Sequence, residues 1–211
     1  MDLSAAYDVL NPDIFIKKAE VLKIGGIALK WLQSFLTGRS QVVEVGNEMS
    51  DRRNLDVGTP QGSPLSCLIF SIYVGDFSLW FDQDKDSLAL AYADDSFLSV
   101  VAKTEEALRE RLQSIGEKVM SFFASNELVA NADETGLLII RPHKRKNDPL
   151  TINIGGAHVV ESSKEKLLGV KIQSDLKWDT HAKTLRFNLQ YRVGVLQRLK
   201  YELKQFGRLI S

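Results

Sequence analysis

Apolar residues recur at helical spacing, every three or four positions, along several stretches of the chain. Asn11 and Pro12 open the first stretch and Gly38 follows the second, as expected for a helix cap, a first helical residue and a helix end. Thr104, followed by two glutamates, predicts the N-cap of a longer helix. The buried stripe of that helix is expected to be Leu108, Leu112, Ile115, Val119 and Phe122. The predicted helices cover residues 12–22, 27–37, 65–81, 105–122 and 178–211.

Alternating apolar and polar residues predict two β-hairpins. QVVEVGNEMSDRRNLDV, residues 41–57, surrounds a Gly-Asn turn, and LALAYADDSFLSVVA, residues 88–102, is expected to turn at Asp94 and Asp95. Further strands are expected at residues 136–140, 151–155 and 167–172. PHKRKNDP, residues 142–149, predicts a flexible, exposed loop. Helices packed on one face of a mostly antiparallel sheet give an α+β fold.

The paired carboxylates of Asp94 and Asp95 interrupt an otherwise apolar hairpin and have no cation beside them in sequence. Desolvating two like charges is costly, so the pair predicts a bound cation. Mg²⁺ prefers carboxylate and phosphate oxygens, as in two-metal phosphoryl-transfer sites. A third carboxylate is expected from a neighbouring strand, and Asp2 is the best candidate. A solvated Asp-Asp turn and a helix-proximal cap are the alternatives for these residues, and Asp8 is interpreted as a structural cap.

The composition excludes several classes of protein. Hydrophobic residues make up 44% of the 211 residues, yet no apolar run approaches the roughly 18 residues that span a bilayer. The N-terminal residues do not resemble a signal peptide. Cys67 is the single cysteine, and His143, His158 and His181 are scattered, so neither a disulfide framework nor a cysteine or histidine metal cluster is expected.

The net charge of zero hides an uneven distribution of charge. Residues 141–211 hold 15 of the 27 basic residues but 6 of the 27 acidic ones. An acidic part followed by a basic part favours a cation site followed by a surface for a polyanion. Two ordinary solvated surfaces are the alternative interpretation.

Three segments carry a family resemblance, in this order and with helices between them. DLSAAYD (2–8), GTPQGSPLS (58–66) and YADD (92–95) resemble the A, B and C motifs of reverse transcriptases. The form of DLSAAYD and the later LLGVKI…W…H segment (167–181) resemble the non-LTR, LINE-type retrotransposon branch. The joint match is far more specific than any one motif, and it spans nearly the whole chain.

The resemblance implies the polymerase palm fold, with an antiparallel, RRM-like or ferredoxin-like sheet backed by helices. Residues 1–141 would form the palm, and residues 142–211 the end of the palm, the primer-grip strands and a thumb-like basic helix. The implied activity is RNA-directed DNA synthesis with two Mg²⁺ ions, or Mn²⁺ in their place. The implied partners are an RNA template, a DNA primer and dNTPs, without a membrane, in the cytoplasm or the nucleus.

The resemblance also implies roles for single residues. Tyr7 corresponds to the aromatic steric gate, whose rigid ring rejects a ribose 2′-hydroxyl by volume. The glycines of residues 58–66 would let the backbone approach a ligand closely at a helix N-terminus. From sequence alone, each segment has an ordinary structural alternative. Tyr7 would be a core aromatic residue, residues 58–66 a turn that caps a helix, and residues 168–170 part of a buried strand. The implied catalytic and metal-binding residues are Asp2, Asp94 and Asp95, the nucleotide-binding residues Tyr7, Gln61 and Gly62, and the primer and template contacts Gly58, Pro60, Leu168 and Gly169.

Two features depart from the family pattern. Glu134, in residues 131–135, stands where the family usually has a lysine that assists pyrophosphate departure, and an anion there would repel a triphosphate. The chain begins at the first catalytic aspartate, so we expect a palm truncated at its N-terminus, without the fingers, and with weak or no polymerase activity. A catalytically dead nucleic-acid-binding remnant and a protein-interaction domain on the same fold remain alternatives.

Overall fold

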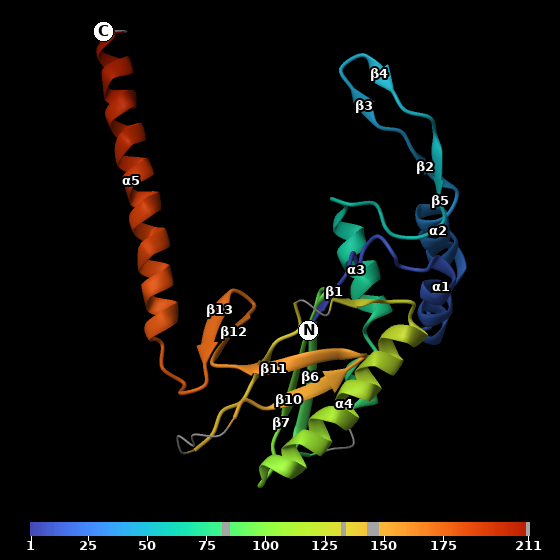
Figure 1. Cartoon of the computed structure of the whole chain (residues 1–211). Coiled ribbons are helices and arrows are strands. Elements are labelled where there is room, and N and C mark those ends of the chain that lie inside the picture. The colour runs from blue at the N-terminus through green and yellow to red at the C-terminus, as the bar shows by residue number, and fades with distance from the viewer. Residues whose placement is uncertain (82–84, 132–133, 143–147, 210–211) are drawn as a thin grey trace. The chain divides into compact units, whose positions relative to one another are not determined.

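The computed structural model describes residues 1–81, 85–131, 134–142 and 148–209, except for the side chains of Asp2 and of residues 201–209 (Figure 1). The predicted loop at 142–149 therefore lies largely outside the described residues. The chain divides into two compact units. Unit 1 comprises Met1–Gly136 and Leu150–Val160, and unit 2 comprises Leu137–Pro149 and Glu161–Ser211.

Unit 1 begins with a short strand and two helices. A long hairpin that contains two separate antiparallel pairs of short strands comes next, and a third helix follows it. The side-chain oxygen of Asn11 accepts a hydrogen bond from the backbone N–H of Asp13 at 2.8 Å, which confirms the predicted cap. The third helix was predicted to reach Phe81, but it ends at Tyr73, just before Gly75, and a 3-10 turn follows. These elements are β1 (Asp2–Leu3), α1 (Pro12–Val21), α2 (Gly26–Leu36), β2 (Arg39–Gln41), β3 (Glu44–Val45), β4 (Glu48–Met49), β5 (Arg53–Leu55), α3 (Pro64–Tyr73) and η1 (Ser78–Trp80).

The second predicted hairpin is formed by β6 (Ser87–Tyr92) and β7 (Asp95–Val100). Its register pairs Tyr92 with Asp95, so the two-residue turn consists of Ala93 and Asp94. The prediction of a turn at Asp94 and Asp95 was wrong by one position. Ala93 adopts the left-handed conformation, with φ of 52°, which a residue with a Cβ rarely takes and which the sequence pattern does not signal.

The long helix α4 (Glu105–Ser125) supplies much of the core of unit 1. The hydroxyl of Thr104 accepts a hydrogen bond from the N–H of Ala107 at 3.2 Å, as the N-cap prediction requires. Ile115, Val119 and Phe122 are buried, whereas the first two residues of the predicted stripe are only half-buried. The core also includes Leu10, Phe15, Leu36, Ile69, Phe70, Tyr73 and Phe77.

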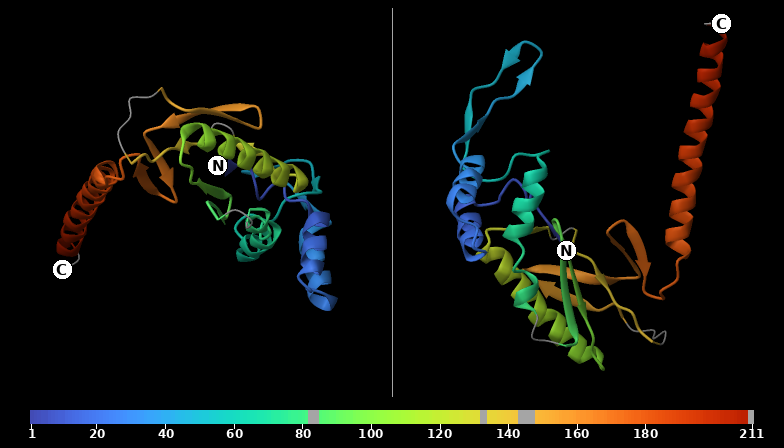
Figure 2. Two further views of the ribbon diagram at one scale, coloured as in Figure 1. Left: turned by 90° about the horizontal axis from the view of Figure 1, so that it is seen from below. Right: turned by 180° about the vertical axis from the view of Figure 1, so that it is seen from behind.

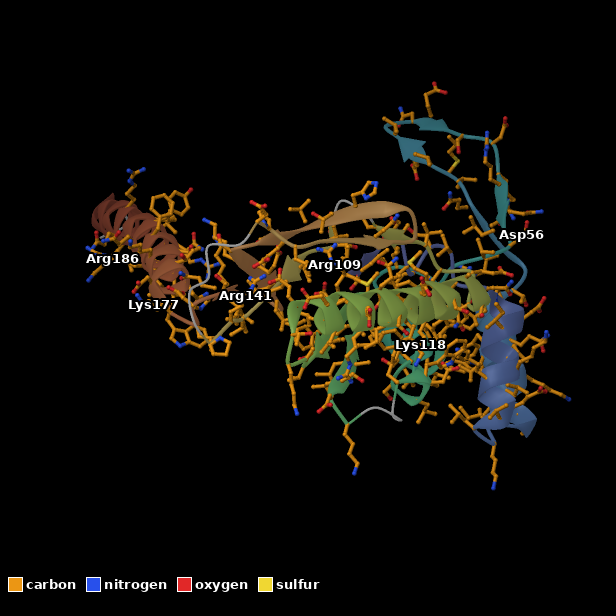
Figure 3. All side chains as sticks on the ribbon, turned by 60° about the horizontal axis from the view of Figure 1, so that its bottom comes forward. Asp56, Arg109, Lys118, Arg141, Lys177 and Arg186 are labelled. Atoms are coloured by element: carbon orange, nitrogen blue, oxygen red, sulfur yellow. The ribbon has the colours of Figure 1, made fainter. Side chains whose placement is uncertain are left out.

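Helix α4 packs against β10 (Thr151–Ile154), as the two views of Figure 2 show. An added Cβ at Gly116 would lie 2.9 Å from the Ile154 side chain, so glycine permits this close approach. The guanidinium of Arg109, labelled in Figure 3, donates to the carbonyl oxygen of Thr151 at 2.9 Å. The remaining strands are β8 (Ala130–Asn131), β9 (Leu137–Leu138) and β11 (Ala157–Ser162), of which β8 pairs with β1, and β11 pairs antiparallel with β10 and parallel with β9.

Unit 2 contains the hairpin of β12 (Lys164–Leu167) and β13 (Val170–Gln173), followed by α5 (Asp179–Leu209). Leu168 and Gly169 were predicted to lie in a strand, but they form the exposed turn of this hairpin. Both have positive φ, 47° and 84°, as a tight type I′ turn requires. The side-chain oxygen of Gln173 accepts a hydrogen bond from the N–H of Thr180 at 2.8 Å and so satisfies one free donor at the start of α5.

Candidate functional site

Strand β1 lies between β8 and β7. The backbone nitrogen of Met1 donates to the carbonyl oxygen of Ser96 at 2.9 Å, and the N–H of Ser96 donates back to Met1 at 2.8 Å. Two reciprocal bonds between one pair of residues occur only in an antiparallel ladder. In this register the next pair, one step toward the hairpin turn, is Asp2 opposite Asp95. The backbone therefore brings the first predicted aspartate beside the tandem pair, from a position more than ninety residues away in sequence.

The two adjacent aspartates occupy different environments. Asp94 lies in the turn and is half-buried, whereas Asp95 is the first residue of β7 and is exposed. Among the side chains that the structure describes, which exclude that of Asp2, no group of three or more His, Cys, Asp or Glu residues could hold a metal ion.

Tyr7 lies at the edge of the core, with its ring centroid 4.7 Å from that of Phe70 on α3. Burial raises the pKa of its hydroxyl, and the nearby side chains of Cys67 and Asp94 raise the pKa further. The structure thus brings together the aromatic residue of the first motif and an aspartate of the third. Cys67 was not predicted to belong to this group, although its spacing of three residues from Phe70 along α3 places both on one helix face.

The glycine-rich loop packs against the segment that follows β1. The N–H of Gly58 donates to the carbonyl oxygen of Leu10 at 2.7 Å, and the N–H of Thr59 donates to that of Tyr7 at 2.8 Å. Gly58 has φ of 83°, and an added Cβ would lie 2.7 Å from the carbonyl oxygen of Asp8. Glycine is therefore required for a close approach, as the sequence predicted, but the partner in this structure is the protein's own backbone.

The other loop residues differ in their contacts. The carbonyl oxygen of Pro60 accepts a hydrogen bond from the Ser66 hydroxyl at 2.6 Å, whereas Gly62 is exposed and an added Cβ there would meet open space. The amide nitrogen of Gln61 donates to the two carboxylate oxygens of Asp8 at 2.8 and 3.1 Å. The interpretation of Asp8 as a structural cap was wrong, because the Asn11 side chain caps α1.

Leu168 and Gly169 belong to unit 2, whereas the other predicted site residues belong to unit 1. Glu134 is exposed, and the two residues before it lie outside the described part of the chain. Within the described ranges, no helix has the length and apolar character needed to cross a membrane.

Comparisons with known proteins agree with these motifs. The family model described as "Reverse transcriptase (RNA-dependent DNA polymerase)" matches residues 1–172. The chain is 23% identical over 200 residues to the probable RNA-directed DNA polymerase from transposon X-element of Drosophila melanogaster. It is 24% identical over 202 residues to the RNA-directed DNA polymerase from mobile element jockey of Drosophila funebris. Each alignment covers 92% of this chain and 21% of the relative, so the chain spans about a fifth of the length of these relatives.

A solved structure shares the fold. Telomerase from Candida tropicalis, determined in complex with the TWJ fragment of telomeric RNA, matches with a TM-score of 0.51 and 16% sequence identity. The match covers 85% of this chain and 29% of the telomerase chain. The mixed arrangement of helices and strands is therefore consistent with a polymerase fold.

Proposed function

Because the chain belongs to the reverse transcriptase (RNA-dependent DNA polymerase) family, we propose that it supplies the catalytic palm of RNA-directed DNA synthesis in a non-LTR retrotransposon. Residues 1–141 are assigned to the palm, and residues 142–211 to the end of the palm, the primer-grip strands and a thumb-like helix. The backbone pairing of Met1 with Ser96 is the observation that carries this proposal, because it brings motif A beside motif C.

Asp2, Asp94 and Asp95 are the residues proposed to hold two Mg²⁺ ions. The donor set fits, because hard divalent cations prefer carboxylate oxygens. Asp94 is half-buried and Asp95 exposed, and neither forms an ion pair within the described residues, so both carboxylates are available to a cation. When bound, the ions would activate the primer 3′-hydroxyl and neutralise charge on the departing pyrophosphate.

The neighbouring residues would select and orient the nucleotide. The packing of Tyr7 on Phe70 supports its role as the steric gate, because a ring held on one side cannot yield to a 2′-hydroxyl. Gly58, Pro60, Gln61 and Gly62 would contact the template base and the incoming nucleotide. Leu168 and Gly169 would contact the primer from an exposed hairpin turn.

The test is equilibrium binding of a deoxynucleoside triphosphate to the whole chain, with Mg²⁺ and with EDTA. Binding is expected only with Mg²⁺, and Asp94→Asn should weaken it at least about tenfold, because affinity depends on the number of charged ligands. Asp13→Asn removes an acidic residue from the first turn of α1 and is the matched control. Equal affinity in EDTA, or in Asp94→Asn, contradicts the proposal.

Primer extension on an RNA template is expected to be weak because of Glu134. Glu134→Lys should raise nucleotide affinity by up to about fivefold, since it replaces an exposed repulsive charge with an attractive one. Glu117→Lys makes the same change of charge on the exposed face of α4 and should have a smaller effect. An equal gain of nucleotide affinity in both variants would mean that the net charge of the protein, rather than the residue at position 134, determines the affinity.

One observation favours a second candidate, a nucleic-acid-binding protein without catalysis. In the described part of α5 the exposed side chains include Lys183, Arg186, Arg192, Arg198 and Lys200, and Figure 3 labels Arg186. Such a surface would bind phosphate backbones with strong salt dependence. RNA binding that persists in Asp94→Ala, together with a complete lack of Mg²⁺-dependent nucleotide binding, would favour this candidate.

A further inference from the structure

Asp8 and Gln61 come from segments more than fifty residues apart, and they meet beside the proposed nucleotide site. The amide nitrogen of Gln61 lies 2.8 Å from one carboxylate oxygen of Asp8 and 3.1 Å from the other. An ionised carboxylate can only accept hydrogen bonds. The NH₂ group of Gln61 must therefore face Asp8, and its carbonyl oxygen must face away.

The backbone on both sides of Gln61 is also held. Before it, the N–H groups of Gly58 and Thr59 bond to the carbonyl oxygens of Leu10 and Tyr7. After it, the hydroxyl of Ser63 accepts a hydrogen bond from the N–H of Leu65 at 3.3 Å and caps α3. These bonds anchor the chain on both sides of Gln61, and the two bonds to Asp8 restrict rotation of its side chain.

We propose that Asp8 is a positioning residue, which holds the Gln61 amide so that its oxygen accepts a hydrogen bond from the incoming nucleotide. This inference rests on the proposed function and names the chemistry of one contact. A carbonyl oxygen attracts donors, so the group it meets is a sugar hydroxyl or a base amino group, and not a phosphate oxygen. Asp8 and Gln61 are exposed, so a nucleotide can reach the pair.

A structural role for the pair is a poor alternative. Asn11, and not Asp8, caps α1. An exposed hydrogen bond between side chains contributes little to stability, because water competes for both partners. Substitution of Asp8 should therefore leave the melting temperature nearly unchanged, which makes nucleotide affinity the informative measurement.

The test is a double-mutant cycle on the whole chain, with Asp8→Asn, Gln61→Glu and the combined variant. Asp8→Asn lets the Gln61 amide adopt either orientation and should weaken binding of the Mg²⁺–dNTP complex about threefold. Gln61→Glu sets two carboxylates against each other and should weaken it about tenfold.

The combined variant exchanges the two functional groups between the two positions. The amide introduced at position 8 donates to the carboxylate introduced at position 61, so an acceptor oxygen again faces the nucleotide, and the net charge equals that of the wild type. The affinity of the combined variant for Mg²⁺–dNTP should return to within about threefold of wild type. If the two substitutions acted independently, their effects would multiply to a loss of about thirtyfold.

Inorganic tripolyphosphate with Mg²⁺ is the matched probe without sugar or base. Asp8→Asn removes a negative charge, so it should not weaken tripolyphosphate binding even though it weakens dNTP binding. The inference is overturned if the losses of affinity in the two single variants add in the combined variant, or if Asp8→Asn weakens binding of both probes equally. In either case, binding of Mg²⁺–dNTP by the wild-type chain would leave the proposed function intact. Complete failure of the wild-type chain to bind Mg²⁺–dNTP overturns both.

Discussion

Helices α4 and α5 carry similar apolar patterns, but their surroundings differ. On α4, Val119 and Phe122 are fully buried beneath neighbouring elements of unit 1. On the described part of α5, Leu189 and Leu196 are 50% and 64% exposed. Periodicity therefore predicts that a helix forms, whereas its burial depends on which other elements cover it.

The two helices therefore contribute differently to the protein. Phe122 contacts the rings of Phe77 and Trp80 at centroid distances of 5.2 and 5.4 Å, and the ammonium of Lys18 lies 5.3 Å from its centroid. Helix α4 thus supports the unit that carries the aspartates. Helix α5 offers a basic surface, which the second candidate function would use to bind nucleic acid.

The largest expected effect is at Phe122. Phe122→Ala should lower the free energy of unfolding by about 3–5 kcal/mol, because it leaves a cavity among aromatic rings. Urea denaturation followed by circular dichroism measures this loss. A loss below about 1 kcal/mol would show that α4 does not hold unit 1 together.

An intermediate effect is expected at alkaline pH, through Tyr73. Its hydroxyl donates to the carbonyl oxygen of Asn126, at the end of α4, at 2.6 Å. The pKa of Tyr73 is raised to about 12, mainly by burial; the hydrogen bond from the Asn11 N–H lowers this pKa, and the charge of Glu127 raises it. Between pH 10 and the folded pKa the native state keeps a proton that the unfolded chain has lost. Stability should therefore fall as the pH rises through this window, by about 2–3 kcal/mol in all.

Unfolding of Tyr73→Phe provides the control for this pH dependence. The variant should lose about 1 kcal/mol near pH 7, because one hydrogen bond is removed, and most of the decline above pH 10 should disappear. Tyr92→Phe alters an exposed ring and should keep the decline. The same decline in all three proteins would mean that Tyr73 does not cause it.

The smallest effect is expected on α5. Leu189→Ala should change the free energy of unfolding by less than about 0.5 kcal/mol, because the side chain is half exposed and alanine favours helix. The comparison with α4 fails if this variant is destabilised by more than about 1 kcal/mol. Such a loss would show that α5 is packed against another surface in solution.

Local sequence signals predicted local structure well. Asn11 and Thr104 cap their helices as expected, because a cap depends on a few adjacent residues. The turns were harder to predict. Ala93 and Leu168 both have positive φ, which their side chains disfavour, so neither residue signals a turn.

The contacts of the candidate site illustrate a different limit. The need of the tandem aspartates for a third carboxylate predicted Asp2 as their neighbour, and the backbone register brings positions 2 and 95 side by side. Nothing local pairs Gln61 with Asp8, because this contact depends on how the glycine loop packs after folding. The sequence therefore indicated which segments lie together, and tertiary packing determines which of their side chains meet.

The central claim is that carboxylates from two distant segments share divalent cations. Binding of Mn²⁺ to the whole chain, followed by electron paramagnetic resonance, tests it with Asp2→Asn, Asp94→Asn and the double variant. Each single variant should weaken Mn²⁺ binding at least about tenfold, and the double variant should lose little more, because both residues serve one site. Unchanged binding in Asp2→Asn, or losses that simply add, would contradict the claim.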